Sequence, residues 1–292
     1  MEKTIGILSM ERMMSRVLNS VGSSRIRVRW LLPYWEEAEE YIIGKKYEVL
    51  IFQKVYWDTF FKYGDYRGIK ILDLCDPDFL ENKPVFEYID KMDAVVTSTE
   101  ELAKYIRKLR PNAIIKCIPD RVYLQEAIPI KEAHSEELKT VAWYGYSRNT
   151  MYLERTFEEL IKRNIELTII SDSQFDLPMR YRNKIKIQNV TYNYSSLNGE
   201  IVKYDAVLMP DPFGDERAKY KSNNKTVQAW AIGMPVIKEP DDFERLASKE
   251  SRIEEAKKNL EIVKNEYDVR LSCLEYRQLI NELKEKKNVK PK

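Results

Sequence analysis

Short apolar segments alternate with amphipathic helical stretches along most of this 292-residue chain, and no other feature constrains its fold as much. Short apolar runs bounded by polar residues are typical of buried strands. In the first half they stand at Thr4–Ser9, Val49–Gln53, Ile69–Leu74, Ala94–Thr97 and Ile114–Ile118. The stretch Glu100–Leu109 has helical spacing, and Ser98 or Thr99 is placed to cap it. Strands that alternate with helices predict βαβ units and a parallel sheet.

The alternation restarts near residue 140, which predicts a second α/β half. Its expected strands are Thr140–Tyr144, Leu167–Ser171, Ala206–Met209 and Pro235–Lys238, with a helix over Met151–Arg163 and a further segment at Ile185–Val190. The segment Gln125–Lys139 has no strong hydrophobic period, so we place the domain boundary there. The predicted fold class is therefore α/β, with two Rossmann-like, doubly wound parallel-sheet domains over residues 1–130 and 131–292.

Beyond Asp241 the chain has no strand pattern. Apolar residues there keep helical spacing, which predicts two or three terminal helices in the second domain and a frayed, Lys-rich tail at Lys284–Lys292. A coiled-coil arm is the alternative for this region.

Composition excludes several classes of protein. The 49 Lys+Arg and 47 Asp+Glu residues give a net charge of only +2, which argues against a surface that binds polyanions everywhere. Three Cys without a CxxC motif exclude a disulfide framework and structural zinc, and a single His excludes a His-rich metal site. No stretch approaches the roughly 18 apolar residues that span a bilayer. We therefore expect a cytoplasmic protein without a signal peptide, and peripheral membrane contact stays open.

Ligands of open parallel sheets bind outside the carboxyl ends of the strands. Gly145, Ser147 and Arg148 follow the strand that ends at Tyr144. Glycine allows close approach to the backbone, while Ser and Arg side chains can donate hydrogen bonds to phosphate oxygens. An ordinary strand-to-helix turn with a surface arginine explains the same residues.

A second loop, Lys221–Lys225, opens a helix expected from about Ser222 to Ile232. With Ser222 or Asn223 as N-cap, the exposed N–H groups and the helix dipole form an anion site, to which the two lysines add charge. A well-capped helix with solvated lysines is the competing interpretation.

The segment KSNNKTVQAWAIGMPVI at Lys221–Ile237 resembles the motif K-S-x-N-K-x-x-E-A/Y-x-A-x-G-x-P-V of GT-B glycosyltransferases, of the type that includes the large retaining nucleotide-sugar family. Segments of the first half agree in order: SSRIR at Ser23–Arg27, YEVLIFQK at Tyr47–Lys54, LDLCDPDF at Leu72–Phe79, DAVVTSTEELAKYIRK at Asp93–Lys108 and CIPDRV at Cys117–Val122. The resemblance implies a GT-B fold, in which two domains face a cleft and the terminal helices cross back to the first domain.

The resemblance also implies a set of site residues. The donor diphosphate would be contacted by Lys221, Ser222, Asn224, Lys225, Gly145, Ser147 and Arg148. Gln228 replaces the acid that grips the ribose in the family, and Tyr220 replaces a partner acid eight residues earlier. The family's N-terminal Gly-Gly loop is absent, which leaves Arg12, Ser24 and Arg25 as possible donor or acceptor contacts.

Five arginines lie between Ser9 and Arg29, namely Arg12, Arg16, Arg25, Arg27 and Arg29. They could flank an anionic ligand. Alternatively, the last three form the exposed side of an alternating strand whose inward residues are Ile26, Val28 and Trp30.

Asp73, Asp76 and Asp78 follow a buried strand. Asp76 is our candidate catalytic residue, as a general base or an orienting group for an acceptor hydroxyl. Asp76-Pro-Asp78 also matches the metal-binding D-x-D of the GT-A fold, although Pro77 is more typical of a turn. The only histidine, His134, is interpreted as a solvated linker residue.

The sequence thus predicts an enzyme, a hexosyltransferase-like glycosyltransferase that moves a sugar from a nucleoside-diphosphate sugar to an acceptor hydroxyl. We expect no cofactor and no metal, and the family likeness favours retention. The acceptor is open among a glycan, a lipid-linked sugar, a small molecule, a protein and modified DNA. The alternatives are a non-catalytic GT-B-like protein that binds a nucleotide or a partner, and a metal-dependent GT-A-like transferase that uses Asp76 and Asp78.

Overall fold

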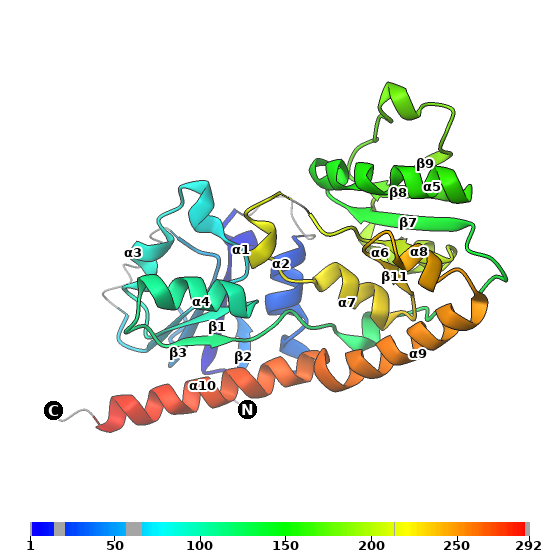
Figure 1. The fold of residues 1–292 in the computed structure, drawn as a ribbon. Helices are drawn as coiled ribbons and strands as arrows, with labels where there is room; N and C mark the ends of the chain where they lie inside the picture. The colour runs from blue at the N-terminus through cyan, green and yellow to red at the C-terminus, as the bar shows by residue number, and fades with distance from the viewer. Residues whose placement is uncertain (1, 15–20, 57–65, 213, 290–292) are drawn as a thin grey trace. The chain divides into compact units, whose positions relative to one another are not determined.

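A computed structural model describes residues 2–14, 21–56, 66–212 and 214–289 (Figure 1). The chain forms two compact units, which are described separately. Unit 1 comprises Met1–Tyr123, Lys219–Ser222 and Tyr267–Lys292, and unit 2 comprises Leu124–Ala218 and Asn223–Glu266. The first division lies close to the predicted boundary at residues 130 and 131. Residues 131–292 do not form one continuous unit, because Lys219–Ser222 and the terminal segment Tyr267–Lys292 belong to unit 1.

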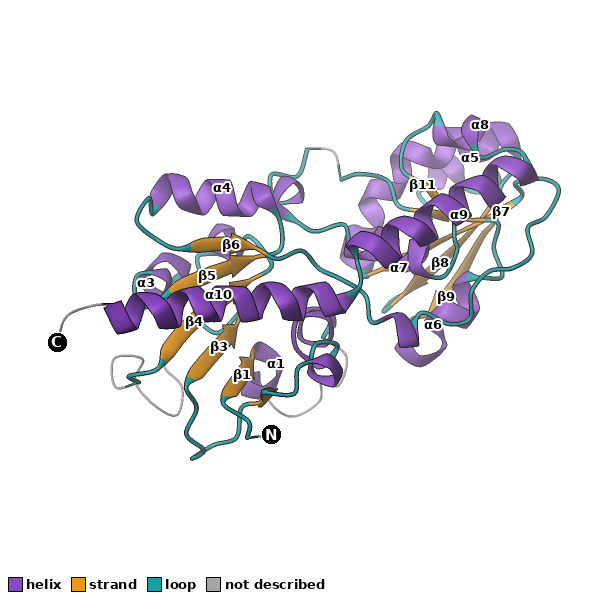
Figure 2. Ribbon diagram, turned by 90° about the horizontal axis from the view of Figure 1, so that it is seen from below, coloured by secondary structure: helices purple, strands orange, loops and turns teal. Residues whose placement is uncertain are grey.

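Unit 1 is built on a six-stranded parallel sheet in the order β2-β1-β3-β4-β5-β6 (Figure 2). Its strands are β1 (Ile5–Ser9), β2 (Ala38–Glu40), β3 (Val49–Gln53), β4 (Ile69–Leu74), β5 (Ala94–Thr97) and β6 (Ile115–Cys117). All five strands predicted for the first half are confirmed, with small changes at their ends. β2 was not predicted, because its residues are mostly polar and it forms an edge of the sheet beside β1.

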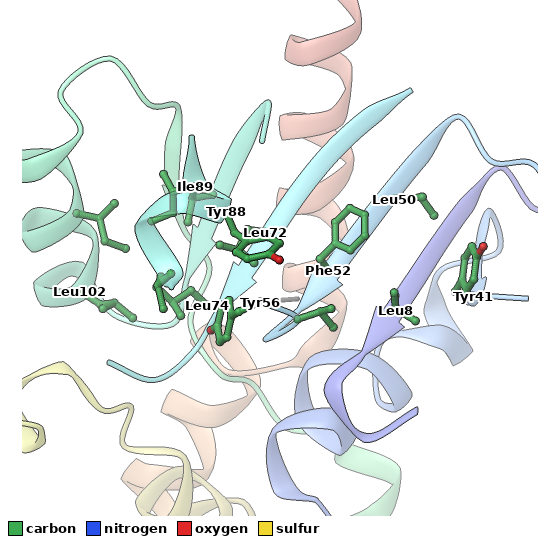
Figure 3. Close-up of a cluster of buried hydrophobic side chains, with 14 of the residues drawn as sticks. Leu8, Tyr41, Leu50, Phe52, Tyr56, Leu72, Leu74, Tyr88, Ile89 and Leu102 are labelled. Atoms are coloured by element: carbon green, nitrogen blue, oxygen red, sulfur yellow. The ribbon is translucent and has the colours of Figure 1, made fainter. Parts of the chain in front are cut away.

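Apolar side chains from β1, β3 and β4 pack with those of α3 (Val85–Ile89) and α4 (Glu100–Leu109) in a buried cluster of unit 1 (Figure 3). The predicted cap of α4 is confirmed, because the Thr99 hydroxyl accepts a hydrogen bond from the Leu102 N–H over 3.2 Å. The helix thereby gains a partner for one of its first N–H groups.

Most of the described residues between β1 and β2 are helical. They form α1 (Met10–Met14), α2 (Gly22–Ser24), a π-helical turn η1 (Arg25–Arg29) and η2 (Leu32–Tyr34). The alternating strand predicted for Arg25–Trp30 is therefore wrong. Alternate residues of a helical turn do not share one face, and Arg25 and Arg27 are buried. Arg16 lies outside the described residues.

Unit 2 contains a five-stranded parallel sheet in the order β11-β10-β7-β8-β9. Its strands are β7 (Thr140–Gly145), β8 (Glu166–Ser171), β9 (Ile187–Thr191), β10 (Ala206–Leu208) and β11 (Val236–Ile237). β7, β8, β10 and β11 confirm the predicted strands, and β9 forms at the segment Ile185–Val190, which was not assigned to a strand. The helix predicted over Met151–Arg163 consists instead of a 3-10 segment, η6 (Ser147–Thr156), followed by α5 (Phe157–Arg163).

The remaining helices of unit 2 include α6 (Tyr194–Ile201) and α7 (Asn224–Ala231). Unit 2 also has short 3-10 turns at η5 (Leu124–Glu126) and η7 (Met179–Tyr181). Two further 3-10 turns are η4 (Asp78–Glu81), in unit 1, and η8 (Ala218–Tyr220), of which Lys219 and Tyr220 belong to unit 1. The expected domain join, Gln125–Lys139, is part of unit 2, where the Lys131 N–H donates to the Ile232 carbonyl over 2.8 Å.

Three terminal helices are present, as predicted: α8 (Asp242–Arg245), α9 (Lys249–Glu266) and α10 (Val269–Val289). α9 packs against α7 in unit 2, whereas α10 lies along the sheet of unit 1 beside β4 (Figure 2). The buried side chains of α10 include Cys273, Tyr276, Leu279, Ile280 and Leu283. The coiled-coil alternative is therefore wrong for α10. The tail is helical as far as Val289, and residues 290–292 lie outside the described part.

In the part of the chain that the structure describes, no helix has both the length and the apolar character that crossing a membrane requires.

Candidate functional site

The end of β7 meets the first turn of α7 within unit 2. The Tyr144 hydroxyl donates to the Lys225 carbonyl oxygen over 2.5 Å. A Cβ at Gly145 would lie 2.8 Å from the Lys225 Nζ, and Gly145 has a φ of +155°. The same ammonium lies 5.6 Å from the centre of the Trp143 ring. The absence of a side chain at Gly145 thus lets a cationic group lie directly against the backbone at the end of the strand.

The N-terminus of α7 adds to this positive character. The first N–H groups of an α-helix have no partner inside the helix, and the helix dipole favours anions there. α7 begins with Asn224 and Lys225, and Asn223 occupies the N-cap position without making a capping hydrogen bond through its side chain. The structure therefore brings together Gly145 and Lys225 of the predicted donor site, and Asn224 precedes Lys225 at the start of the helix.

Ser222, the other expected N-cap, has a different partner. Its hydroxyl donates to Asp120 Oδ2 over 2.5 Å, inside unit 1. Lys221 belongs to unit 1 as well. The predicted diphosphate segment is thus divided, with Lys221 and Ser222 in unit 1 and Asn224 and Lys225 in unit 2.

The loop after β7 differs from the prediction in one respect. Ser147 donates from its N–H over 2.7 Å and from its hydroxyl over 3.2 Å to the carboxylate of Asp172. The backbone hydrogen bond from Ser147 is the main reason that the pKa of Asp172 lies below its usual value. A carboxylate therefore holds the Ser147 hydroxyl that we expected at a phosphate. Arg148 is exposed, and its guanidinium lies 5.8 Å from the centre of the Tyr146 ring.

Gln228, the predicted ribose contact, is half-buried on α7. Its amide nitrogen donates to Asn198 Oδ1 over 3.3 Å, and the Asn198 amide donates to the Glu126 carbonyl over 2.9 Å. This leaves the Gln228 carbonyl oxygen as the atom that can accept a hydrogen bond from a hydroxyl.

Polar groups of unit 1 gather where β3 and β4 end. Lys54, directly after β3, has a left-handed φ of 55°. Its ammonium lies 2.6 Å from Asp76 Oδ2 and 3.3 Å from Asp78 Oδ2. Burial by itself would lower the pKa of Lys54, but the neighbouring Cys75, Asp76 and Asp78 raise it above its usual value. The strained backbone of a non-glycine residue is typical of functional positions.

This ammonium bears on the metal hypothesis for Asp76 and Asp78. Lys54 already supplies the cation between the two carboxylates. Asp78 is buried and also accepts hydrogen bonds from Tyr56 over 2.9 Å and from Lys83 over 3.0 Å. Asp76 keeps 30% of its side chain exposed, which suits a group that contacts a ligand.

The other predicted contacts of unit 1 lie near the ends of β1 and β3. The backbone N–H of Arg12 donates to the Ser9 hydroxyl over 3.1 Å. The exposed guanidinium of Arg12 lies 3.6 Å from the Glu40 carboxylate. Ser24 is buried and donates to Gln53 Oε1 over 3.3 Å. The guanidinium of Arg25 lies 5.7 Å from the centre of the Trp30 ring.

Sequence reasoning missed a buried charge network in unit 1. The Arg27 guanidinium contacts both oxygens of Asp73 at 3.2 and 3.1 Å, Asp120 at 3.3 Å and the Tyr276 hydroxyl at 3.2 Å. Burial opposes the charge of Arg27, but these partners raise its pKa above the usual value. The sequence signal for this network was an acid near the end of each of two strands, Asp73 in β4 and Asp120 after β6. A buried arginine requires such partners.

His134 was expected to be solvated but is half-buried in unit 2. Burial is the main cause that lowers the pKa of His134 to about 4, and the charges of Lys131 and Arg252 add to it. The expectation that His134 is solvated is therefore wrong.

No family model and no curated protein matches this sequence. Solved structures do match. The DNA-modifying enzyme β-glucosyltransferase, solved with and without uridine diphosphoglucose, has a TM-score of 0.58 and 11% identity, over 95% of this chain and 99% of that one. The lipopolysaccharide outer core galactosyltransferase WaaB has a TM-score of 0.60 and 12% identity, over 95% and 99%. A glycosyltransferase from Rickettsia africae has a TM-score of 0.58 and 10% identity, over 97% and 98%.

These proteins are GT-B glycosyltransferases, and the match covers nearly the whole of each chain. Together with the two parallel sheets, it confirms the predicted GT-B fold. The GT-A fold is excluded for this chain. At such low identity the likeness establishes the fold alone.

Proposed function

We propose that this protein is a glycosyltransferase that moves a sugar from a nucleoside-diphosphate sugar to an acceptor hydroxyl. The observation that carries the proposal is the Lys225 ammonium beside the bare backbone of Gly145, at the start of α7. On a fold shared with nucleotide-sugar glycosyltransferases, this arrangement is suited to the donor's diphosphate.

The chemistry of transfer asks for stabilisation of the leaving group. Breaking the bond between the sugar and the diphosphate leaves negative charge on the phosphate, and fixed cations and N–H donors stabilise that charge. Lys225 and the first turn of α7 supply both in unit 2. Lys221 and Arg148 are further cations that we assign to the diphosphate. Because these groups carry the charge stabilisation, we propose metal-independent transfer, and the family likeness favours retention.

Asp76 and Gln228 complete the assignment. Asp76 is the candidate for accepting a hydrogen bond from the acceptor hydroxyl, with its carboxylate oriented by Lys54. Gln228 is the candidate for contact with the ribose, without the charge assistance of an acid.

The test is turnover of a panel of nucleotide sugars by the full chain in the presence of EDTA. UDP-glucose comes first, because one solved neighbour was crystallised with uridine diphosphoglucose. Acceptors are a glycan, a lipid-linked sugar, a small alcohol, a protein and hydroxymethylated DNA. We expect release of the nucleoside diphosphate with EDTA present and a glycoside of unchanged anomeric configuration. Loss of turnover in EDTA, restored by Mn²⁺, would contradict metal independence.

A second candidate function is nucleotide binding without catalysis. The replacement of both family acids, by Gln228 and by Tyr220, favours it. Nucleoside-diphosphate binding without turnover on any acceptor would support this candidate, and absence of binding would exclude both.

A further inference from the structure

The segment Lys219–Ser222 belongs to unit 1, although the chain on either side of it belongs to unit 2. Tyr220 is only 4% exposed and is part of the buried apolar cluster of unit 1. Its ring meets those of Phe79 and Tyr105 edge-on, at centroid distances of 5.8 and 5.4 Å. Its carbonyl oxygen accepts a hydrogen bond from the Thr99 hydroxyl over 2.9 Å. A buried aromatic side chain therefore anchors this segment in unit 1.

Ser222, at the end of the segment, is held by a charged partner. Its hydroxyl donates over 2.5 Å to Oδ2 of Asp120, which is 5% exposed. The other oxygen of Asp120 lies 3.3 Å from Arg27 Nη1, and Arg27 is fixed in turn by Asp73. A hydrogen bond to an ionised carboxylate is stronger than one between neutral groups. The network thus fixes the oxygen that faces Ser222.

We propose that Asp120 is a positioning residue for the donor diphosphate. It holds Ser222, and through it the backbone next to Lys221, where the chain leads into α7. Only Asn223 separates Ser222 from the first residue of that helix. The inference rests on the proposed function and adds to it a residue that acts through Ser222. It also gives Tyr220, where the family has an acid, an anchoring role.

The direction in which loss of the Asp120 carboxylate changes diphosphate affinity distinguishes a positioning role from a purely electrostatic one. A diphosphate is anionic, so removal of a nearby carboxylate would strengthen its binding if Asp120 acted through its charge alone. If Asp120 acts by positioning, its removal should instead weaken binding. Loss of Asp120 or of the Ser222 hydroxyl frees the segment, and the diphosphate must then order it at an entropic cost.

The experiment is calorimetric titration of the full chain with UDP, with GDP and ADP in parallel. We expect Ser222→Ala to raise the Kd of the tightest-binding nucleotide about tenfold, equivalent to ~1.4 kcal/mol. Ser222→Thr, which keeps the hydroxyl, should restore binding. Asp120→Asn should also weaken binding. The double variant, with Ser222→Ala and Asp120→Asn together, should have a Kd no higher than that of the single variant that binds less tightly, because both changes remove the same contact.

Ser98→Ala is the matched control. It removes another buried serine hydroxyl of unit 1, which donates to the Cys75 carbonyl over 3.0 Å, and should leave the Kd unchanged. A Kd unaltered by Ser222→Ala, or tighter binding by Asp120→Asn, overturns the positioning role and leaves the proposed function standing. Absence of nucleotide binding by the unsubstituted chain overturns both.

Discussion

The residues around Lys225 distinguish it from an ordinary surface lysine. A lysine in the first turn of a helix is usually solvated, and the sequence alone allowed that interpretation. Gly145 leaves room for the Lys225 ammonium, and Tyr144 holds the Lys225 carbonyl oxygen. These contacts set Lys225 apart from the exposed lysines of the surface.

Lys225→Ala tests this role. Because the side chain is only half-buried, we expect the variant to lose about 1 kcal/mol of stability or less. Its affinity for UDP, or its turnover, should fall at least about tenfold. Titration and thermal melting measure the two effects. Lys162→Ala, at a position 69% exposed on α5, is the control. Equal losses of binding and stability would assign Lys225 to the fold instead.

His134 gives the chain a pH dependence that can be traced to one residue. Its pKa is lowered from 6.5 to about 4, chiefly by burial, so the folded chain keeps the imidazole neutral where the unfolded chain protonates it. The unfolded state binds more protons between these values. The resulting contribution to stability is complete above pH 6.5 and is lost as the pH falls towards 4.

His134→Gln should therefore flatten the stability profile. We expect the free energy of unfolding of the unsubstituted chain to fall between pH 7 and pH 5 more steeply than that of the variant. Urea denaturation at pH 7, 6 and 5 measures both slopes. Since the chain has no other histidine, parallel profiles would show that His134 is solvated after all.

At the scale of elements, α10 supplies more to unit 1 than an apolar face. The Tyr276 hydroxyl donates to Asp73 Oδ2 over 2.5 Å and accepts from Arg27 over 3.2 Å. Burial raises the pKa of Tyr276 well above its usual value, so it stays protonated. The helix thereby completes the charge network that also contains Asp120.

Tyr276→Phe removes one hydroxyl and leaves two buried charged groups short of a partner. We expect a loss of about 1–3 kcal/mol in the free energy of unfolding. Chemical denaturation measures it, with Tyr123→Phe, at a half-exposed tyrosine of the same unit, as the control. A loss no larger than that of the control would mean that the network does not depend on α10.

At the scale of the whole molecule, unit 1 is assembled from three separate stretches of chain. Its sheet forms from the first stretch, but α10 comes from the last. A unit built in this way depends on its final segment, because the sheet face beneath α10 is otherwise exposed to water.

Truncation after Glu266 should therefore unfold unit 1. Each fully buried apolar side chain contributes about 1.5–3 kcal/mol, and α10 buries several, against a typical total stability of about 5–15 kcal/mol. We expect limited proteolysis to digest residues before about 124 and to spare unit 2. A chain that ends at Val289 is the control. Persistent protection of the N-terminal residues in the truncated chain would show that unit 1 folds without α10.

The sequence by itself determined most strands of both sheets, their parallel arrangement and the cap of α4, but not the polar edge strand β2. Each of these depends on a pattern within a few neighbouring residues, such as an apolar run or Thr99 three residues before Leu102. The loop after a predicted strand indicated Gly145, and the likeness of Lys221–Ile237 to a known motif indicated Lys225.

Only the tertiary structure decided the partners of the polar groups. Ser147 faces Asp172 and Ser222 faces Asp120, although their spacing in the chain indicates neither pair. Arg27, expected on an exposed strand, is buried beside Tyr276, 249 residues away. Hydrophobic periodicity indicates which side of a segment is buried. It does not indicate which charged residue, distant in the chain, pairs with a buried charge, because that pairing is decided when the segments pack together.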